Sequence, residues 1–428
     1  MSNKEPLMGG APVQPKGSLM AGVFVLANTI LGAGMLGLPF AFASCGFILG
    51  PLMLFAFAVC SSTALILLSL CADKVGREKS PKFFDVASAA IPGVGTIIDV
   101  AVGIKCTGVA TSYLIVVGDS VPKAIVTFGA TGIWLDRRIW TLVALCAGGF
   151  AAFQRNLTAL KNVSIVALTC VMCIVVMITL FAIEPTTAFD PCADHETASA
   201  TPCRGPVELF TEPMTLLRAL PLFVFSYTCH QNIFSITNEL ENRTPWRCAQ
   251  IAIYAIGIAL CVYIVLGTAG YLTFGSLVAK DILVSYPTSS YVVSFARLAI
   301  SLVVTTCYPL QAHPTRAALS TLVGALSTKD EDRRKELANP YTPDGYKLSL
   351  VLTAFFIMMT GSIACTIHDL GLVLSVVGAT GSTIVSYVLP GASYFLLFPE
   401  RADRYIGLTL LCIGLVIMPL SLYLIFVH

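Results

Sequence analysis

The sequence predicts an all-α membrane protein that crosses the bilayer many times, and three observations lead to this fold class. Hydrophobic residues make up 56% of the 428 positions and charged residues only 12%, and the mean hydropathy is +0.82. Soluble domains carry about 25% charged residues, so two or three soluble domains are excluded. The apolar runs have the length that a membrane-spanning helix needs, and they lack the alternation of β-barrel strands. The net charge of +2 does not favour binding to nucleic acid.

Eleven apolar runs, each bounded by charged residues or by clusters of Pro, Gly and Asn, predict eleven spans. They lie at about 18–41, 46–72, 97–121, 139–153, 160–184, 213–238, 248–275, 289–311, 348–367, 370–398 and 404–427. The preceding residues, 1–17, form a polar tail, and residues 18–428 form a single transmembrane domain. Because no small-residue cleavage site follows the first run, we expect this run to be retained as a span.

The positions of Lys and Arg predict the orientation of the chain. With the amino terminus in the cytosol, 18 of the 26 basic residues fall in cytosolic segments. Five fall in segments on the opposite face, namely Lys123, Arg137, Arg138, Arg204 and Lys280. Basic residues concentrate on the cytosolic side, so the amino terminus is predicted to be cytosolic and the carboxyl terminus luminal or extracellular. Cys192 and Cys203 then lie in one non-cytosolic loop, where an oxidising compartment favours a disulfide between them.

The first span contains Gly32, Ala33 and Gly34 near its middle. A Gly inside a helix costs about 1 kcal/mol relative to Ala, and unwound backbone in hydrocarbon must find other hydrogen-bond partners. One interpretation is an unwound stretch at a ligand site. The alternative is a small-residue surface on which a neighbouring helix packs closely.

The sixth span favours the first interpretation, because polar residues interrupt it at mid-depth from Ser226 to Asn232. Two interrupted spans that are five spans apart indicate an inverted repeat of five plus five helices, with a substrate site between the broken helices. The repeats are predicted at 18–184 and 213–398, with 404–427 as a peripheral eleventh helix. The sequence therefore predicts a secondary transporter.

Three segments resemble the amino acid/auxin permease family. They are residues 28–34, residues 106–119 (CTGVATSYLIVVGD) and residues 220–232 (LPLFVFSYTCHQN). The resemblance extends over nearly the whole chain and implies a LeuT-type fold with eleven spans. The family contains the sodium-coupled neutral amino acid transporters of animals and the vacuolar amino acid transporters of fungi. The segment at 225–232 is closer to the vacuolar branch, which favours a proton-linked carrier in an acidic-organelle membrane. A sodium-coupled plasma-membrane symporter and an amino acid sensor on a transporter fold are the alternatives.

A zwitterionic amino acid needs donors for its carboxylate and acceptors for its ammonium group. Amides at the glycine-containing break supply donors, because a half-helix begins there and its dipole favours negative charge. The resemblance assigns the ammonium group to carbonyls of the sixth span. A tyrosine in the third span either caps the carboxylate or packs between helices. The predicted substrate-binding residues are Gly32, Ala33, Gly34, Tyr113, Phe225, Ser226 and Tyr227.

The coupling ion has two sets of candidate residues. Sodium-coupled relatives use an Asn in the first span and a Thr in the eighth; Asn28 matches the first, and Thr305 or Thr306 lies near the second. Their oxygen atoms are ligands of the hard kind that such a cation prefers. His230, just past the sixth-span break, is the proton candidate, because an imidazole changes its charge between pH 5 and 8. A structural, hydrogen-bonded His is the alternative.

Other ionisable residues within spans are hypotheses of function by default. Arg297 lies near mid-depth in the eighth span and is predicted to form a gate or an ion pair, whereas Asp99 and Lys105 are interpreted as a pair at a helix end. The sequence contains no phosphate-binding loop, metal cluster or catalytic set. We expect no enzyme activity, no cofactor beyond a coupled proton or sodium ion, and no other metal. The expected partners are an amino acid and the lipid bilayer, with the chain as a monomer.

Overall fold

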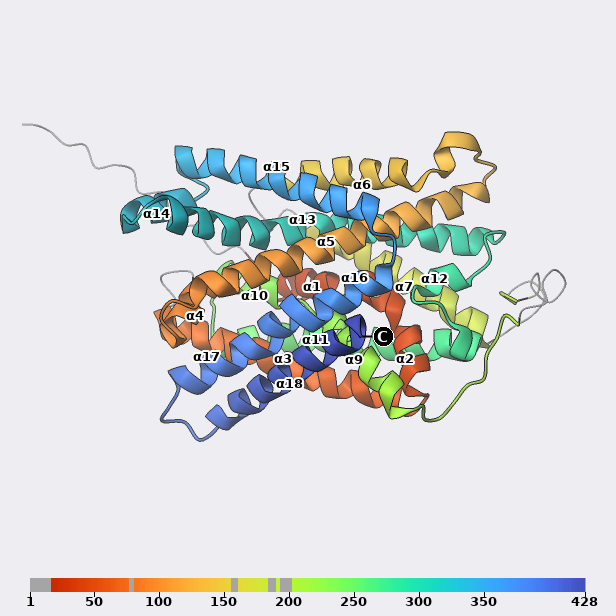
Figure 1. Ribbon diagram of the computed structural model, residues 1–428, viewed down its shortest axis with the longest axis horizontal. Helices are drawn as coiled ribbons and strands as arrows, with labels where there is room; N and C mark the ends of the chain where they lie inside the picture. Colours follow the sequence, from red (N-terminus) through yellow and green to blue (C-terminus); the bar gives the residue numbers. More distant parts are fainter. Residues whose placement is uncertain (1–16, 77–80, 155–160, 184–189, 193–201, 428) are drawn as a thin grey trace, which may run out of the picture.

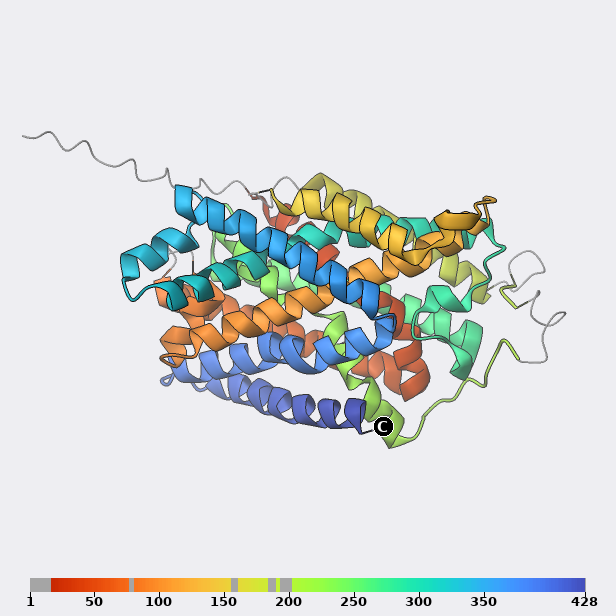
Figure 2. The same ribbon diagram turned by 45° about the horizontal axis from the view of Figure 1, so that its top comes forward.

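The computed structural model describes most of the chain. The described residues are 17–76, 81–154, 161–183, 190–192 and 202–427. Helices make up nearly all of this described part, to which an isolated bridge between Gly17 and Leu240 is added. The predicted cytosolic tail falls almost wholly outside it. Figures 1 and 2 show the long helices side by side along the longest axis of the molecule, with α4 and α14 at one end and α12 at the other.

Seven long helices are continuous. They are α3 (Leu49–Gly76), α5 (Gly95–Val126), α7 (Lys161–Ile183), α11 (Pro245–Phe274), α13 (Tyr291–Ser327), α15 (Pro343–Thr366) and α18 (Arg404–Phe426). The short helices at the two ends of the bundle are α4 (Phe83–Ala90), η3 (Gly132–Leu135), η6 (Gly275–Leu277), α12 (Ile282–Ser285) and α14 (Glu331–Ala338). The remaining helices contain the interruptions or are shorter, and they belong to the first, fourth, sixth and tenth predicted spans.

Among the described residues, eight helical stretches are long and apolar enough to cross a membrane, and a bent pair raises this number to nine. Each of the eleven predicted runs contains helix in its described part. Two of them fall short of a span by length: α6 (Arg137–Ala152), and the sixth run, which divides into α9 (Pro213–Ser226) and α10 (Ile233–Asn238). The all-α membrane class is therefore confirmed, while the number eleven remains part of the proposal below.

The first predicted span is broken where the glycines predict a break. α1 (Leu19–Ile30) ends before Gly32, whose backbone has φ −104° and ψ −146°, and η1 (Ala33–Gly37) then leads into α2 (Leu38–Cys45). The two parts meet at an angle of 45°. The extended Gly32 leaves carbonyls at the end of α1 and amides at the start of η1 outside the regular helical hydrogen bonding.

The sixth predicted span is also broken. After α9, a non-helical stretch precedes η5 (His230–Asn232), which continues into α10. The tenth predicted span stays continuous but widens: α16 (Leu370–Val377) passes through the π-helical segments η7 (Gly378–Ser382) and η8 (Ile384–Val388) into α17 (Leu389–Leu397). π-turns occur frequently at functional sites. Gly378 permits the close approach of η7 to α9, because a Cβ there would lie 2.2 Å from the carbonyl oxygen of Pro221.

Helix α13 extends well beyond its predicted end at residue 311 and reaches Ser327, passing through Pro309 and Pro314. The predicted run ends at residue 311 because Pro314 and Arg316 follow it. The extension has a buried face that includes Ala318 and Gly324. Tertiary burial of one face stabilises a helix more than its local propensities do, so the helix persists.

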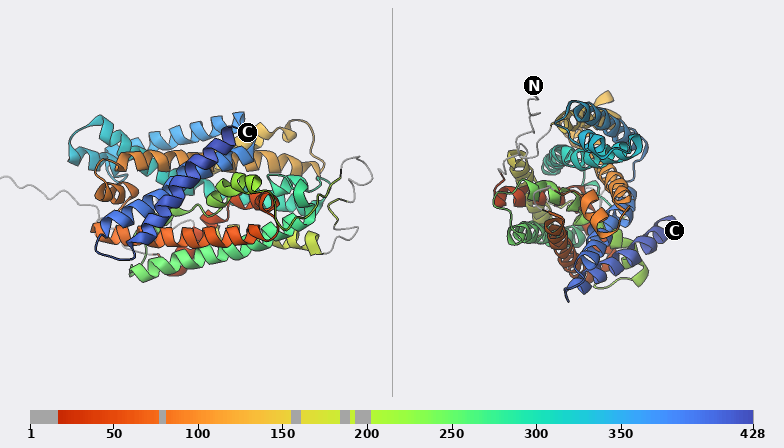
Figure 3. Two further views of the ribbon diagram at one scale, coloured as in Figure 1. Left: turned by 60° about the horizontal axis from the view of Figure 1, so that its bottom comes forward. Right: turned by 90° about the vertical axis from the view of Figure 1, so that its left-hand side faces the viewer.

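Helix α5 lies in the middle of the bundle and α18 at its edge. The most apolar window of α5 is 83% buried, whereas that of α18 is only 28% buried, and α5 packs most extensively against α13. Figure 3 shows α18 crossing obliquely over the outside of the other helices. A polar side chain on α5 is therefore enclosed by protein, and most of α18 is left to face lipid.

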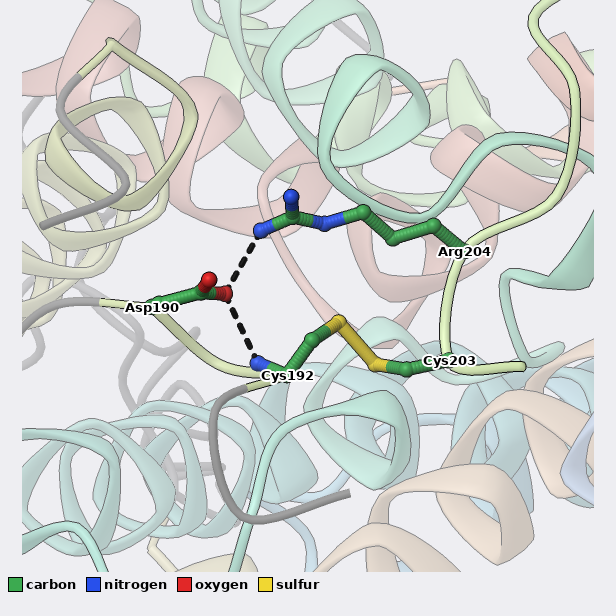
Figure 4. The surroundings of a disulfide bond; sticks show 4 residues. All are labelled: Asp190, Cys192, Cys203 and Arg204. Carbon is green, nitrogen blue, oxygen red and sulfur yellow. Dashed lines mark hydrogen bonds and ion pairs between the residues drawn. A yellow bond between two sulfur atoms is a disulfide. The ribbon is translucent and has the colours of Figure 1, made fainter. Parts of the chain in front are cut away.

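The polar loop between α7 and α9 contains a disulfide between Cys192 and Cys203. Asp190 accepts hydrogen bonds from the Cys192 amide at 2.9 Å and from Arg204 at 2.6 Å, as Figure 4 shows. The two cysteines predicted to pair are thus joined in the structure, and an ion pair closes the same loop beside them.

Candidate substrate and ion site

The two helix breaks meet at the centre of the bundle through glycines that leave no room for a side chain. A Cβ on Gly32 would lie 3.0 Å from the Tyr113 hydroxyl oxygen, and a Cβ on Gly34 would lie 3.0 Å from Cδ1 of Phe225. Both glycines are buried. The third span and the sixth span therefore both contact the backbone of the first break. The two interpretations of the glycines, an unwound stretch and a small-residue packing surface, thus both apply to the same segment.

Tyr263 of α11 joins the ends of the two broken helices. Its hydroxyl oxygen lies 2.6 Å from the Ile30 carbonyl oxygen at the end of α1, and 2.9 Å from the Ser226 carbonyl oxygen at the end of α9. A hydroxyl group has a single proton to donate, so two carbonyls share one donor. The Ile30 carbonyl also accepts from the Gly32 amide at 2.9 Å, so it is the Ser226 carbonyl that retains a lone pair for a further donor.

Five of the predicted substrate residues thus meet at the breaks, and the other two lie beside them. Ala33 begins η1 and is 1% exposed. The Tyr227 carbonyl already accepts a hydrogen bond from the Ser61 hydroxyl at 3.3 Å, and its ring packs edge-on against that of Tyr263. Sequence reasoning missed Tyr263, because a Tyr within an apolar run is indistinguishable from one that only packs between helices.

A buried chain of polar side chains leads from Tyr113 to a lysine. Gln311 Nε2 donates to the Tyr113 hydroxyl at 3.4 Å, and Gln231 Nε2 donates to Gln311 Oε1 at 3.1 Å. The chain ends at Lys105, whose Nζ donates to Gln231 Oε1. Lys105 and both glutamines are at most 2% exposed. These three residues come from α5, η5 and α13, so no single stretch of sequence reveals the chain.

The interpretation of Lys105 as a partner of Asp99 is wrong. Six residues along a helix separate two side chains by about 120° around its axis, so they point in different directions. The Lys105 ammonium group faces Gln231, while one carboxylate oxygen of Asp99 finds no hydrogen-bond partner among the described residues. Lys105 is therefore a buried cation close to the helix breaks.

The candidate cation ligands are arranged differently from the prediction. Asn28 donates through Nδ2 to the Ser164 hydroxyl at 3.2 Å, and its Oδ1 accepts from the Cys307 thiol at 3.4 Å. The hydroxyls of Thr305 and Thr306 each donate to a carbonyl earlier in α13 at 2.7 Å. The residue of α13 that faces Asn28 is thus the cysteine that follows the two threonines.

His230 is completely buried and has one satisfied ring nitrogen. Its Nδ1 lies 2.9 Å from the hydroxyl oxygen of Ser386 in η8, and its Nε2 has no hydrogen-bond partner among the described residues. The structure thus combines features of both predicted alternatives, a hydrogen-bonded nitrogen and a free one. The π-helical segment of the tenth span supplies the partner.

Arg297 is 1% exposed, and carbonyl groups surround its guanidinium group. It donates to the carbonyl oxygens of Leu283 and Tyr286, both at 2.9 Å, and of Pro287 at 3.3 Å. No carboxylate of the described residues lies within 4 Å of it, so the predicted ion pair is replaced by contacts to the backbone. Arg297 thereby fixes the segment before α13, which sequence spacing could not indicate.

A large cavity lies away from the breaks. It has a volume of about 530 Å³, lies between α5, α13, α15 and α16, and has an almost wholly apolar lining that includes Asp99. A zwitterion needs two charged or dipolar partners, so this cavity does not suit an amino acid. A second cavity, of about 300 Å³, is lined by Arg218 and by the ion pair between Lys280 and Asp369.

The chain is similar to known proteins over nearly its whole length. The family model described as "Transmembrane amino acid transporter protein" matches residues 15–427. Vacuolar amino acid transporter 5 of Schizosaccharomyces pombe is 34% identical, over 92% of this chain and 89% of the relative. Vacuolar amino acid transporter 6 of Saccharomyces cerevisiae is 30% identical, over 94% and 97%. Sodium-coupled neutral amino acid transporter 7 of Homo sapiens is 26% identical, over 87% and 78%.

The fold also resembles that of a solved structure. The crystal structure of MhsT in complex with L-phenylalanine aligns with a TM-score of 0.58 at 11% identity, over 96% of this chain and 100% of MhsT. At this identity the likeness concerns the fold alone. It extends over nearly the whole chain.

Proposed function

Because this chain belongs to the family of transmembrane amino acid transporter proteins, we propose that it is a secondary active carrier that moves neutral amino acids together with protons. Its relatives are transporters, so the chain is a membrane transporter and not an enzyme. Two vacuolar relatives at 30% identity or more support an acidic-organelle membrane as its location. The cytosolic amino terminus belongs to the same proposal.

The substrate binds between the two broken helices, and access alternates between the two sides of the membrane. The observation that carries this proposal is the Tyr263 hydroxyl, which contacts the carbonyls of Ile30 and Ser226 at the ends of both half-helices. Amides after Gly32 suit a carboxylate, and Tyr113 lies beside them as its cap. The Ser226 carbonyl, which keeps a lone pair beside Tyr263, suits an ammonium group.

The matching breaks support an inverted repeat of residues 18–184 and 213–398, with eleven spans in all. α1 and α2 in the first half correspond to α9 and α10 in the second half, and each pair surrounds the proposed site. Broken helices in corresponding positions of two repeats are typical of carriers with a central site. The low burial of α18 supports its place as a peripheral helix outside the repeats.

A proton is preferred to sodium because of the residue opposite Asn28. Cys307 presents a thiol there, and a thiol is a soft ligand that is poorly matched to a hard cation. The hydroxyls of Thr305 and Thr306 are directed to carbonyls of their own helix. Asn28 and Ser164 still offer oxygen atoms to a cation, so sodium coupling is the second candidate, supported by the sodium-coupled relative.

Uptake of radiolabelled neutral amino acids into proteoliposomes tests the proposal. Uptake should follow an imposed pH gradient when a large organic cation replaces sodium, and Asn28→Ala should impair it by removing the side chain that holds α1 against α7 and α13. Uptake that requires a sodium gradient and ignores pH would establish the sodium-coupled alternative. Saturable amino acid binding without uptake under either gradient would indicate a sensor.

A further inference from the structure

Lys105 is a charged side chain without a charged partner. It is 0% exposed on the central helix α5, and no carboxylate of the described residues lies within 4 Å of its ammonium group. Burying an ammonium group without a charged partner costs free energy. Such residues within membrane spans are therefore candidates for a function. The one side chain that accepts a hydrogen bond from it in the structure is the amide of Gln231.

A protonated lysine fixes the direction of the whole polar chain. An ammonium group can only donate, so the Gln231 carbonyl must face it and the Gln231 NH₂ group must face Gln311. Gln311 in turn presents its NH₂ group to the Tyr113 oxygen. The Tyr113 hydroxyl, which accepts from Gln311, keeps its own proton for a ligand at Gly32.

A neutral lysine removes this constraint, because its nitrogen gains a lone pair and can accept. Gln231 can then turn its NH₂ group to Lys105, and Gln311 reverses in the same way. In this second arrangement Tyr113 donates its proton to the carbonyl of Gln311, and the hydroxyl donor that faces the helix break is lost. A neutral amine can still donate to Gln231, so both arrangements are allowed when Lys105 is neutral, whereas only the first is allowed when it is protonated.

We propose that Lys105 is the proton-binding site of the carrier, and that Gln231 and Gln311 transmit its protonation state to Tyr113, which caps the substrate carboxylate. This inference rests on the proposed function. A proton on Lys105 strengthens carboxylate binding, and a bound carboxylate strengthens proton binding by the same factor. The two ligands consequently bind together, as symport requires.

The surroundings of Lys105 single it out as the proton site. Cys106 on its own helix and Cys229 and His230 after α9 are close enough to interact with it electrostatically. From α13 the polar chain receives the uncharged Gln311, and η7 approaches at Gly381, where a Cβ would lie 2.6 Å from the Cβ of Lys105. Two thiols and an imidazole provide no permanent anion. His230 hydrogen bonds to Ser386, outside the chain that reaches Tyr113.

The test compares Lys105→Met and Gln311→Leu with wild-type protein and with Lys123→Met. Lys123 lies in the last turn of the same helix, outside the polar chain, and serves as the matched control. Substrate affinity is measured from pH 5 to pH 8, together with exchange of labelled amino acid and uptake driven by a pH gradient. Wild type and Lys123→Met should lose affinity by about tenfold from pH 5 to pH 8.

In Lys105→Met, exchange should fall to the wild-type rate at pH 8 and no longer vary with pH, and gradient-driven accumulation should be lost. Gln311→Leu should weaken the pH dependence of affinity although the lysine is intact. If Lys105→Met does not fold, Lys105→Gln, which keeps a donor without the charge, should also lose the pH dependence of affinity and the gradient-driven accumulation. Wild-type pH dependence in a folded Lys105 variant, or in Gln311→Leu, would overturn the inference. Wild-type protein that exchanges no amino acid would instead refute the proposed function.

Discussion

At the scale of single residues, Gly32 and Gly34 control how closely the first break approaches its neighbours. Their missing side chains let Tyr113 and Phe225 contact the backbone directly. Nearby polar residues depend on this approach, because the Tyr113 hydroxyl can reach a ligand at Gly32 only if no Cβ intervenes. Small changes at these two positions therefore change the site and leave the rest of the bundle intact.

We expect Gly32→Val and Gly34→Val to abolish substrate-induced thermal stabilisation while expression and membrane insertion stay near wild type. The added methyl groups occupy the space of the Tyr113 hydroxyl and of the Phe225 ring. Gly257→Val is the control, because a Cβ at Gly257 has no neighbouring atom within 4 Å. Stabilisation by substrate that is unchanged in both break variants would refute a carboxylate site on this backbone.

Asp281 predicts a pH dependence of stability outside the spanning helices. It is 7% exposed and caps α12 by accepting from the Leu283 amide at 2.9 Å. Burial raises the pKa of Asp281 from 3.8 to about 6. Between these values the folded state binds more protons than the unfolded state, so the contribution of Asp281 to stability grows as the pH falls through about 6.

Asp281→Asn should remove this dependence, because an amide keeps the capping oxygen and does not titrate. The apparent Tm of wild-type protein in detergent should rise between pH 7 and pH 5 relative to that of the variant. Parallel Tm curves for the two proteins over this range would contradict the prediction. Such a dependence would suit a loop that faces an acidic lumen.

At the scale of elements, Tyr263 holds two helix ends with one hydroxyl group. It comes from α11 and donates to carbonyls at the ends of α1 and α9 that lie outside the regular helical hydrogen bonding. The tyrosine therefore sets the distance between the two broken helices. Arg297 also joins backbone segments, because its guanidinium group donates hydrogen bonds to carbonyls that precede α13.

Tyr263→Phe should destabilise the protein by about 1–3 kcal/mol, because it leaves the buried Ser226 carbonyl without its donor. We expect a lower Tm and a weaker substrate affinity, since the helix ends lose their shared anchor. Tyr254→Phe on the same helix is the control, because Tyr254 is 48% exposed. If the two variants behave alike in both measurements, Tyr263 does not join the helix ends.

At the scale of the whole molecule, the disulfide relates the orientation of the chain in the membrane to the redox state of the compartment that its loop faces. The basic residues predict that the loop with Cys192 and Cys203 faces the lumen or the outside, where disulfides persist. The described cysteines outside this pair are free and lie on helices or beside the breaks. The one described disulfide therefore marks the predicted non-cytosolic end of the bundle.

Peptide mapping of unreduced protein should recover Cys192 and Cys203 joined. Cys192→Ser should lower the free energy of unfolding by about 2–3 kcal/mol, because it opens the loop that the disulfide closes between cysteines 11 residues apart. Transport should otherwise persist. Cys261→Ser, which changes an exposed free cysteine, should leave stability unchanged. Finding both loop cysteines as free thiols would contradict the disulfide and weaken the assigned orientation.

The sequence by itself determined the class, the helical runs and both breaks. A span through the hydrocarbon core needs about 20 apolar residues, and its backbone groups need hydrogen-bond partners within the protein. Spans and breaks can therefore be predicted from local sequence. Gly32 and the polar run after Ser226 mark the breaks for this reason. The end of α13 lies at Ser327 and not near residue 311, because burial of its last turns stabilises the helix against the prolines within it.

Tertiary structure alone decided which side chains meet. Lys105, Gln231 and Gln311 are separated by 126 and 80 positions in the chain, and their hydrogen bonds exist only because α5, η5 and α13 pack together. The same packing places Cys307 opposite Asn28 and carbonyls around Arg297. Spacing along a sequence records the faces of one helix, whereas contacts between helices depend on rotation and offset that no single helix encodes.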